Sequence, residues 1–143
     1  MTKLLLLMFS LLPTPSMVGQ PQGPTTLEAL RDHHRVLLVF GNGNNQLAEA
    51  QLTVAADHVD GFRERDLLLT GLQGTNATVP TARLSPADEA AARQRFHVAA
   101  GQFTVILIGK DGGEKLRSHK PIPWEKLQST IDAMPMRKDE VRR

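Results

Sequence analysis

The sequence contains no cysteine among its 143 residues. Without a thiolate the chain has no thiol nucleophile, so thiol peroxidase and disulfide oxidoreductase activity are excluded. A lipid anchor attached to cysteine is excluded for the same reason. The fold must therefore be held together by packing alone, although an exported chain could use disulfide bonds.

The sequence also lacks a large excess of one charge and a long apolar segment in its main part. Lysine and arginine number 17 against 15 acidic residues, a net charge of +2, which indicates no nucleic-acid partner. Beyond the N-terminal segment, no run approaches the roughly 20 apolar residues that a transmembrane helix requires. We therefore expect no membrane span once that segment is removed.

Metal-binding patterns are missing as well. The five histidines form no His-x3-His or HExxH pair. The run Asp-His-Val-Asp at 57–60 can be read as a group of ligands or as the polar end of a helix, and the missing spacing favours the helix end. We expect no metal and no cofactor, and we identify no catalytic residue.

The N-terminal segment has the layout of a secretory signal peptide. Lys3 precedes an apolar run over 4–12, and a stretch rich in proline, glycine and glutamine follows. Ser16 and Gly19 are candidate cleavage positions. We interpret 1–19 as the signal peptide and predict a secreted or periplasmic protein; the alternative is a buried N-terminal strand or helix.

The rest of the chain divides into three parts. Residues 20–26 form a linker rich in proline and glycine, and 27–136 form one domain that is long enough for a real core. The mixed charges of 137–143 predict a tail that frays. The mixed charges of 62–66 likewise predict a solvated turn or a local ion pair.

The apolar pattern within the domain predicts alternating strands and helices. Continuous apolar runs are typical of strands that are covered on both faces, whereas spacings of three and four residues indicate helices. Predicted strands lie at 35–40, 65–71, 103–109 and 114–118, and helices at 27–34, from 45 to about 61, at 86–96 and at 124–134, where Pro135 ends the last one.

The order β-α-β-α-β-β-α predicts the topology. Strands joined through a helix should lie parallel by a right-handed crossover, and the last two strands should form a hairpin. We therefore predict a thioredoxin-like α/β fold, a four-stranded mixed sheet with helices on both faces.

Two C-terminal motifs, FTVILIGKDGGEKLR (103–117) and IDAMPMRKDE (131–140), are the most specific in the chain. With them it resembles an uncharacterised family of secreted, peroxiredoxin- and thioredoxin-like domains over about 26–140. That family occurs as small exported bacterial proteins and within animal sushi-repeat and related extracellular-matrix proteins. The resemblance implies fold and compartment and supplies no catalytic residues. Its signature residues are Gly109, Lys110, Asp111, Gly112, Gly113, Asp132, Met134, Pro135, Met136 and Arg137.

The sequence departs from redox members of the thioredoxin class at two places. Their attacking cysteine lies near the start of the helix after the first strand, where this chain has Gly-Asn-Gly-Asn-Asn at 41–45. Their proline before the third strand is replaced by Gly101-Gln102. Both departures argue against the redox activity that such a fold often supports.

The segment 41–45 is nevertheless the best candidate site. Its backbone N–H groups and the amides of Asn42, Asn44 and Asn45, with Gly43 between them, can bind an anion at a helix start. The alternative is a plain turn in which glycine and asparagine serve the backbone. That plain turn is the interpretation we favour.

The run Gly-Lys-Asp-Gly-Gly at 109–113 has a weaker claim to a site. A P-loop needs its lysine after the second glycine and a serine or threonine next, so a hairpin turn explains this run better. In 134–137, Met134 should pack on the core, and Met136 with Arg137 are candidates for a partner surface.

Two functions follow from these observations. The first is a binding or accessory module for an envelope or extracellular protein or polymer. The second is a thiol-independent enzyme with its site at 41–45. The occurrence of the resembled family within animal extracellular-matrix proteins favours the first.

Overall fold

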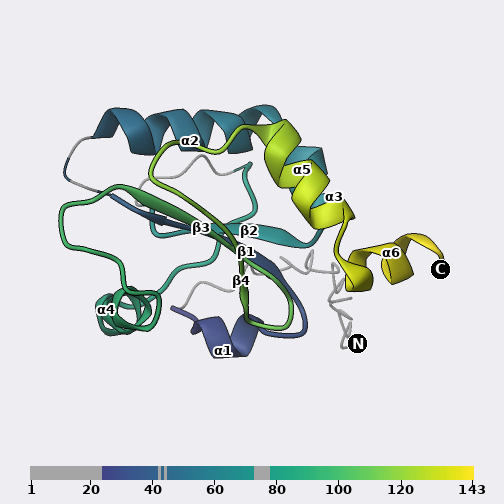
Figure 1. Ribbon diagram of the computed structural model, residues 1–143, viewed down its shortest axis with the longest axis horizontal. Helices are drawn as coiled ribbons and strands as arrows, with labels where there is room; N and C mark the ends of the chain where they lie inside the picture. Colours follow the sequence, from purple (N-terminus) through teal and green to yellow (C-terminus); the bar gives the residue numbers. More distant parts are fainter. Residues whose placement is uncertain (1–23, 42, 44, 73–77) are drawn as a thin grey trace, which may run out of the picture.

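The computed structural model describes residues 24–41, 43, 45–72 and 78–143. The helices and strands that the sequence predicted occur in the expected order, and short helices that were not predicted accompany them (Figure 1). The elements are α1 Leu27–Leu30, β1 Arg35–Phe40, α2 Asn45–Asp57, α3 Val59–Glu64, β2 Leu67–Thr70, α4 Pro86–Arg95, β3 Thr104–Ile108, β4 Glu114–Ser118, α5 Trp124–Asp132 and α6 Pro135–Val141.

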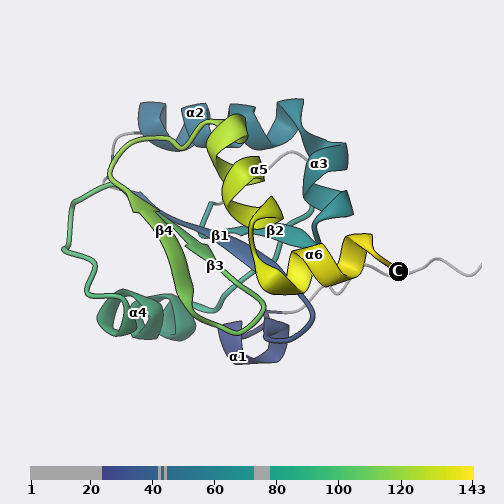
Figure 2. The same cartoon turned by 45° about the vertical axis from the view of Figure 1, so that its right-hand side comes forward.

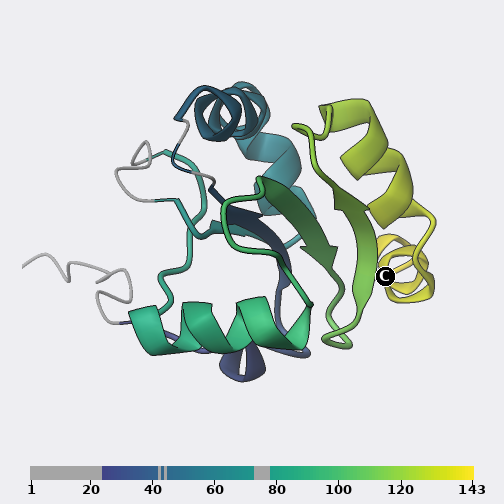
Figure 3. The ribbon, with the colours of Figure 1, turned by 60° about the vertical axis from the view of Figure 1, so that its left-hand side comes forward.

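The strands form one mixed sheet in the order β2-β1-β3-β4. β1 and β2 are parallel, whereas β3 is antiparallel to β1 and to β4. Figure 3 shows α4 on one side of this sheet and α2 and α5 on the other. The thioredoxin-like α/β prediction, with helices on both faces of a four-stranded sheet, is confirmed.

β1 shows why a continuous apolar run predicted a strand covered on both faces. All six of its residues are buried. Val36, Leu38 and Phe40 belong to the core beneath α1 and α4. Leu37 and Val39 belong to the larger core beneath α2, α3 and α5. Because side chains alternate along a strand, one run of apolar residues supplies both cores.

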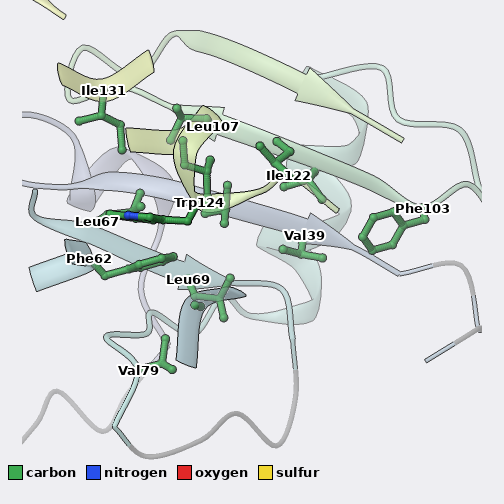
Figure 4. Packing of buried hydrophobic residues seen from close by; sticks show 14 residues of the cluster. Val39, Phe62, Leu67, Leu69, Val79, Phe103, Leu107, Ile122, Trp124 and Ile131 are labelled. Carbon is green, nitrogen blue, oxygen red and sulfur yellow. The ribbon is translucent and has the colours of Figure 1, made fainter. Parts of the chain in front are cut away.

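The larger core is organised around Trp124, the single tryptophan of the chain (Figure 4). Its ring stacks on Phe62 with centroids 5.8 Å apart and on His58 at 5.0 Å. Gly61 faces the ring so closely that a Cβ there would lie 2.3 Å from Cζ2 of Trp124. The glycine therefore lets α3 approach α5.

His58 is a structural residue, as the interpretation of 57–60 as a helix end requires. Its Nδ1 lies 2.9 Å from the carbonyl oxygen of Val54, and its ring covers Trp124. Within the described ranges, no group of three or more histidine or acidic side chains is placed to hold a metal ion.

The direction of the third strand differs from the prediction that strands joined through a helix lie parallel. β2 and β3 are joined through α4, and yet β3 runs antiparallel to β1 and therefore also to β2. The connection is not a simple helical crossover, because it makes an extra pass along the sheet edge. Thr81 lies parallel beside Leu69, with Ala82 donating its N–H to the carbonyl of Leu69 at 3.0 Å.

Two helix boundaries also differ from the predictions. The helix predicted to end near Gly61 breaks at His58, whose φ of −132° leaves the helical range, and α3 then continues to Glu64. The charged tail is helical as far as Val141: Pro135 starts a second helix, α6, with Met134 as its N-cap residue. Proline is favoured at the first helical position, because its missing N–H has no partner to lose there. No helix of the described segments is long and apolar enough to cross a bilayer.

Candidate functional site

The predicted site at 41–45 lies at the C-terminal end of β1. Gly43 is exposed, with a φ of 81° that favours glycine. Asn45 begins α2. Asn42 and Asn44 lie outside the described residues, so an anion site at this turn stays a prediction.

The signature run at 109–113 forms the turn of the β3–β4 hairpin, as predicted. Gly109 donates its N–H to the carbonyl of Gly113 at 2.9 Å, and Gly113 donates its own to Oδ1 of Asp111 at 2.9 Å. Gly112 has a φ of 80°. These glycines serve the turn geometry. Lys110, in the same run, is buried and belongs to a group of paired charged residues.

Charged residues from six elements or turns meet at the end of the sheet opposite Gly41. They come from the start of β1, the end of α3, the turn before β2, the hairpin, the end of α5 and α6. Figure 2 shows α6 beyond α5 at this end. We call these residues the α6 charge cluster: Arg35, Glu64, Arg65, Asp66, Lys110, Asp132, Arg137 and Glu140.

Glu140 joins α6 to the sheet. Its two carboxylate oxygens each accept a hydrogen bond of 3.2 Å from the guanidinium of Arg35, which is fully buried. Lys110 donates to Glu140 at 2.6 Å and to Asp66 at 2.9 Å. Asp66 has a φ of 48°, an uncommon backbone conformation in the turn into β2.

Asp132 joins α5 to α3. It accepts two hydrogen bonds of 3.0 Å from Arg65, a paired geometry that fixes orientation as well as distance. Arg137 of α6 donates to the carbonyl of Glu64 at 3.1 Å and to its carboxylate at 2.9 Å. Of the two interpretations of 62–66, the local ion pair is confirmed by Arg65 and Glu64 at 3.5 Å, whereas the solvated turn is wrong for Arg65, which is buried beside Trp124.

Two carboxylates of this cluster, Asp132 and Glu140, are held in their charged form. Hydrogen bonds and charge attraction from Arg65 hold the pKa of Asp132 below its ordinary value. Partial burial alone would raise the pKa of Glu140, but hydrogen bonds from Lys110 and Arg35 outweigh it and lower the pKa. Such carboxylates suit structural pairing better than proton transfer, which needs a pKa near the working pH.

We expect α6 to detach in acid. Because folding lowers the pKa values of Asp132 and Glu140, their contribution is complete above the ordinary carboxylate range and is lost as the pH falls through the folded values. Hydrogen exchange should show α6 amides less protected at about pH 3 than at about pH 6, after correction for intrinsic rates. Glu140→Gln should remove part of this dependence. Equal α6 protection at both pH values would contradict the prediction.

Two hollows flank α6. One, of about 450 Å³, lies between the hairpin turn and the turn from α5 to α6. The other, of about 480 Å³, lies between α6 and the ends of α3 and α5. Met136 lines the first and Val141 the second. In the described part of the chain, Met136 and Val141 are the large hydrophobic residues that are exposed, with 44% and 68% of their surface accessible to solvent.

The predictions for 134–137 are thus partly explained. Met134 packs against the larger core, as expected. Met136 is exposed beside a hollow. Arg137 is buried and paired with Glu64, so it supports the surface from behind and does not face solvent.

Comparison with protein families gives one match. Residues 26–140 match the family described as Domain of unknown function (DUF4174). The chain belongs to this family. The match covers all the elements described above, including α6 as far as Glu140, so the α6 charge cluster lies within the family's own domain. No curated protein matches the chain.

Solved structures of similar shape are peroxiredoxins from malaria parasites. The mitochondrial 2-Cys peroxiredoxin of Plasmodium falciparum has 13% identity and a TM-score of 0.55, over 82% of this chain and 84% of that one. The reduced 2-Cys peroxiredoxin of Plasmodium vivax has 15% identity and a TM-score of 0.57, over 79% of this chain and 84% of that one. Thioredoxin peroxidase I of Plasmodium yoelii has 16% identity and a TM-score of 0.58, over 79% of each chain. At these identities the DUF4174 chain shares their fold, and it has no cysteine with which to share their chemistry.

Proposed function

We propose that this DUF4174 chain is an exported binding module for an envelope or extracellular protein, and that α6 and its two hollows form the binding surface. The observation that carries the proposal is the position of Met136 and Val141. Both are exposed on one short helix, and each borders a hollow. Apolar residues rimmed by polar ones are typical of protein-binding surfaces.

The charge around α6 favours an acidic partner. The residues lining the two hollows include seven cationic side chains against three acidic ones, and the buried cations among them are already paired with carboxylates of the α6 charge cluster. The lining cations are Arg35, Lys110 and Lys115 in the first hollow and Arg65, Arg137, Lys138 and Arg142 in the second; the acids are Asp111, Glu64 and Asp132. Lys138 and Arg142 are exposed and can meet a partner directly. Such complementarity steers association and selects partners.

Site-specific photo-crosslinking in the native host tests the proposed surface. A photoreactive residue at Met136 or at Val141 is expected to give the same single adduct, because the two positions border one surface. Lys138→Glu with Arg142→Glu should reduce that adduct about ten-fold or more by reversing the charge that attracts the partner. The control position is Ala90, which is exposed on α4 across the sheet. An absent adduct, or the same adduct from Ala90, would refute the proposal.

Export is tested separately with the N-terminal segment. Residues 1–26 joined to a reporter enzyme that is active only outside the cytoplasm should give activity. Leu5→Arg together with Leu6→Arg should abolish it, because charge interrupts the apolar run that an export signal needs. Equal reporter activity from the two fusions would argue against a signal peptide.

A further inference from the structure

We infer that the hollow between the hairpin turn and the turn from α5 to α6 binds a small amphipathic carboxylate, an alkyl chain that ends in one carboxyl group. This inference rests on the proposed function, because it names a ligand class for part of the same surface. It is carried by the lining of the hollow, which separates charge from apolar surface, and by a buried cationic residue with an unpaired N–H.

One wall of the hollow is apolar. It is formed by four consecutive residues, 133–136, which turn the chain from α5 into α6. Ala133, Pro135 and Met136 are exposed there, so this wall is open to a ligand. Methionine side chains are flexible and polarizable and adapt to an alkyl chain of any shape. The volume of about 450 Å³ is within the range of small-molecule sites.

The opposite wall is charged. Arg35, Lys110, Lys115 and Asp111 line it, and Glu140 behind it already pairs with Arg35 and Lys110. Lys115 hydrogen-bonds Asp111 at 2.7 Å, and an ammonium group carries further N–H donors that a ligand oxygen can use. Lys115 is also the most accessible of the three cations, with about a third of its side chain exposed (32%). It is therefore the group that meets the ligand.

Arg35 adds a second, independent observation. Its side chain is fully buried, and its Nε has no hydrogen-bond partner among the described residues. Buried polar groups are nearly always paired, so an unpaired one in the lining of a hollow calls for an explanation. Glu140 already accepts hydrogen bonds from both terminal nitrogens of this guanidinium, and a ligand carboxylate in the hollow would act through its charge on the donor that is left.

A titration of the full chain with decanoate tests the inference, followed by amide chemical shifts in NMR spectra. Saturable shifts are expected at residues 109–115 and 133–136. Lys115→Gln should weaken binding about two- to five-fold, the upper part of the range for losing one partly exposed ion pair. Met136→Gln should weaken it by at least about three-fold through lost apolar contact. Lys126→Gln, the matched change of an exposed lysine on α5 outside the hollow, should leave binding unchanged.

Three results would overturn the inference. Equal binding of decanol would show that the carboxyl group is not recognised. Binding of a short apolar peptide through its C-terminal carboxylate, without binding of decanoate, would identify a peptide site instead. No saturable shift at millimolar decanoate would leave no site at all.

The crosslinking experiment separates this inference from the proposed function. If decanoate does not bind and the adduct from Val141 still forms, only the inference fails, because Val141 borders the other hollow. If the adduct is absent as well, both fail.

Discussion

Replacing Trp124 by alanine is expected to lower the free energy of unfolding by about 3–5 kcal/mol, the usual cost of truncating a large buried aromatic side chain. Trp124 is only 9% exposed and stacks on both Phe62 and His58. Its loss removes the aromatic packing between α5 and α3 and leaves the ion pair of Asp132 with Arg65. Chemical denaturation followed by circular dichroism measures the effect, since the variant has no tryptophan fluorescence.

Gly61 provides the control for this prediction. In the natural chain, Gly61→Ala brings a Cβ to within 2.3 Å of Cζ2 of Trp124, so one of the two helices must shift. In the Trp124→Ala background this clash is gone, and the same substitution should cost little, since alanine favours a helix more than glycine does. A cost of Gly61→Ala that is equal in both backgrounds would contradict the packing described here.

The elements that were predictable from sequence are those whose signal is local. The continuous apolar run of β1 and the stripe of Trp124, Leu127 and Ile131 on α5 each indicate burial within a few residues of chain, and the structure buries both. The Asp-Gly-Gly turn is local in the same way. Together with the order of the elements, these signals are enough for the fold class.

The α6 charge cluster was not predictable in this way, because its pairs join distant parts of the chain. Arg35 and Glu140 are 105 residues apart, and Arg137 and Glu64 are 73 apart. From sequence alone, a run of charged residues such as 137–143 is interpreted as solvent-exposed, because its ion-pair partners elsewhere in the chain are not known. One local signal was present: a proline that ends one helix can also start the next, and Pro135 does both.

The direction of β3 was missed for a related reason. The pass of chain at Thr81 has no apolar periodicity, and its pairing with Leu69 depends on backbone hydrogen bonds. Sequence patterns report side-chain burial, so they do not register such a segment. The candidate site at 41–45 depended on analogy with the redox position of the fold, whereas the hollows beside α6 arise from contacts between α3, α5, α6 and the hairpin.

Removing the side chain of Arg35 should have the second large effect. Arg35→Ala is expected to lower the free energy of unfolding by about 3 kcal/mol, because it leaves a void and removes the buried partner of Glu140. The carbonyl of Arg65 also loses the hydrogen bond that Arg35 donates at 2.8 Å. Arg35→Met keeps most of the volume and should cost about 1–2 kcal/mol, which isolates the polar part.

Arg63→Ala is the matched control, since Arg63 is largely exposed and its ion pair with Asp60 spans 3.9 Å. It should change stability by less than about 0.5 kcal/mol. Hydrogen exchange then measures whether Arg35 anchors α6. Both Arg35 variants should expose the amides of α6 while β1 and β3 stay protected, because Arg35 holds α6 through Glu140 and the strands through backbone pairing. If α6 exchange is unchanged in Arg35→Met, Lys110 alone holds Glu140, and Arg35 does not anchor the helix that carries the proposed binding surface.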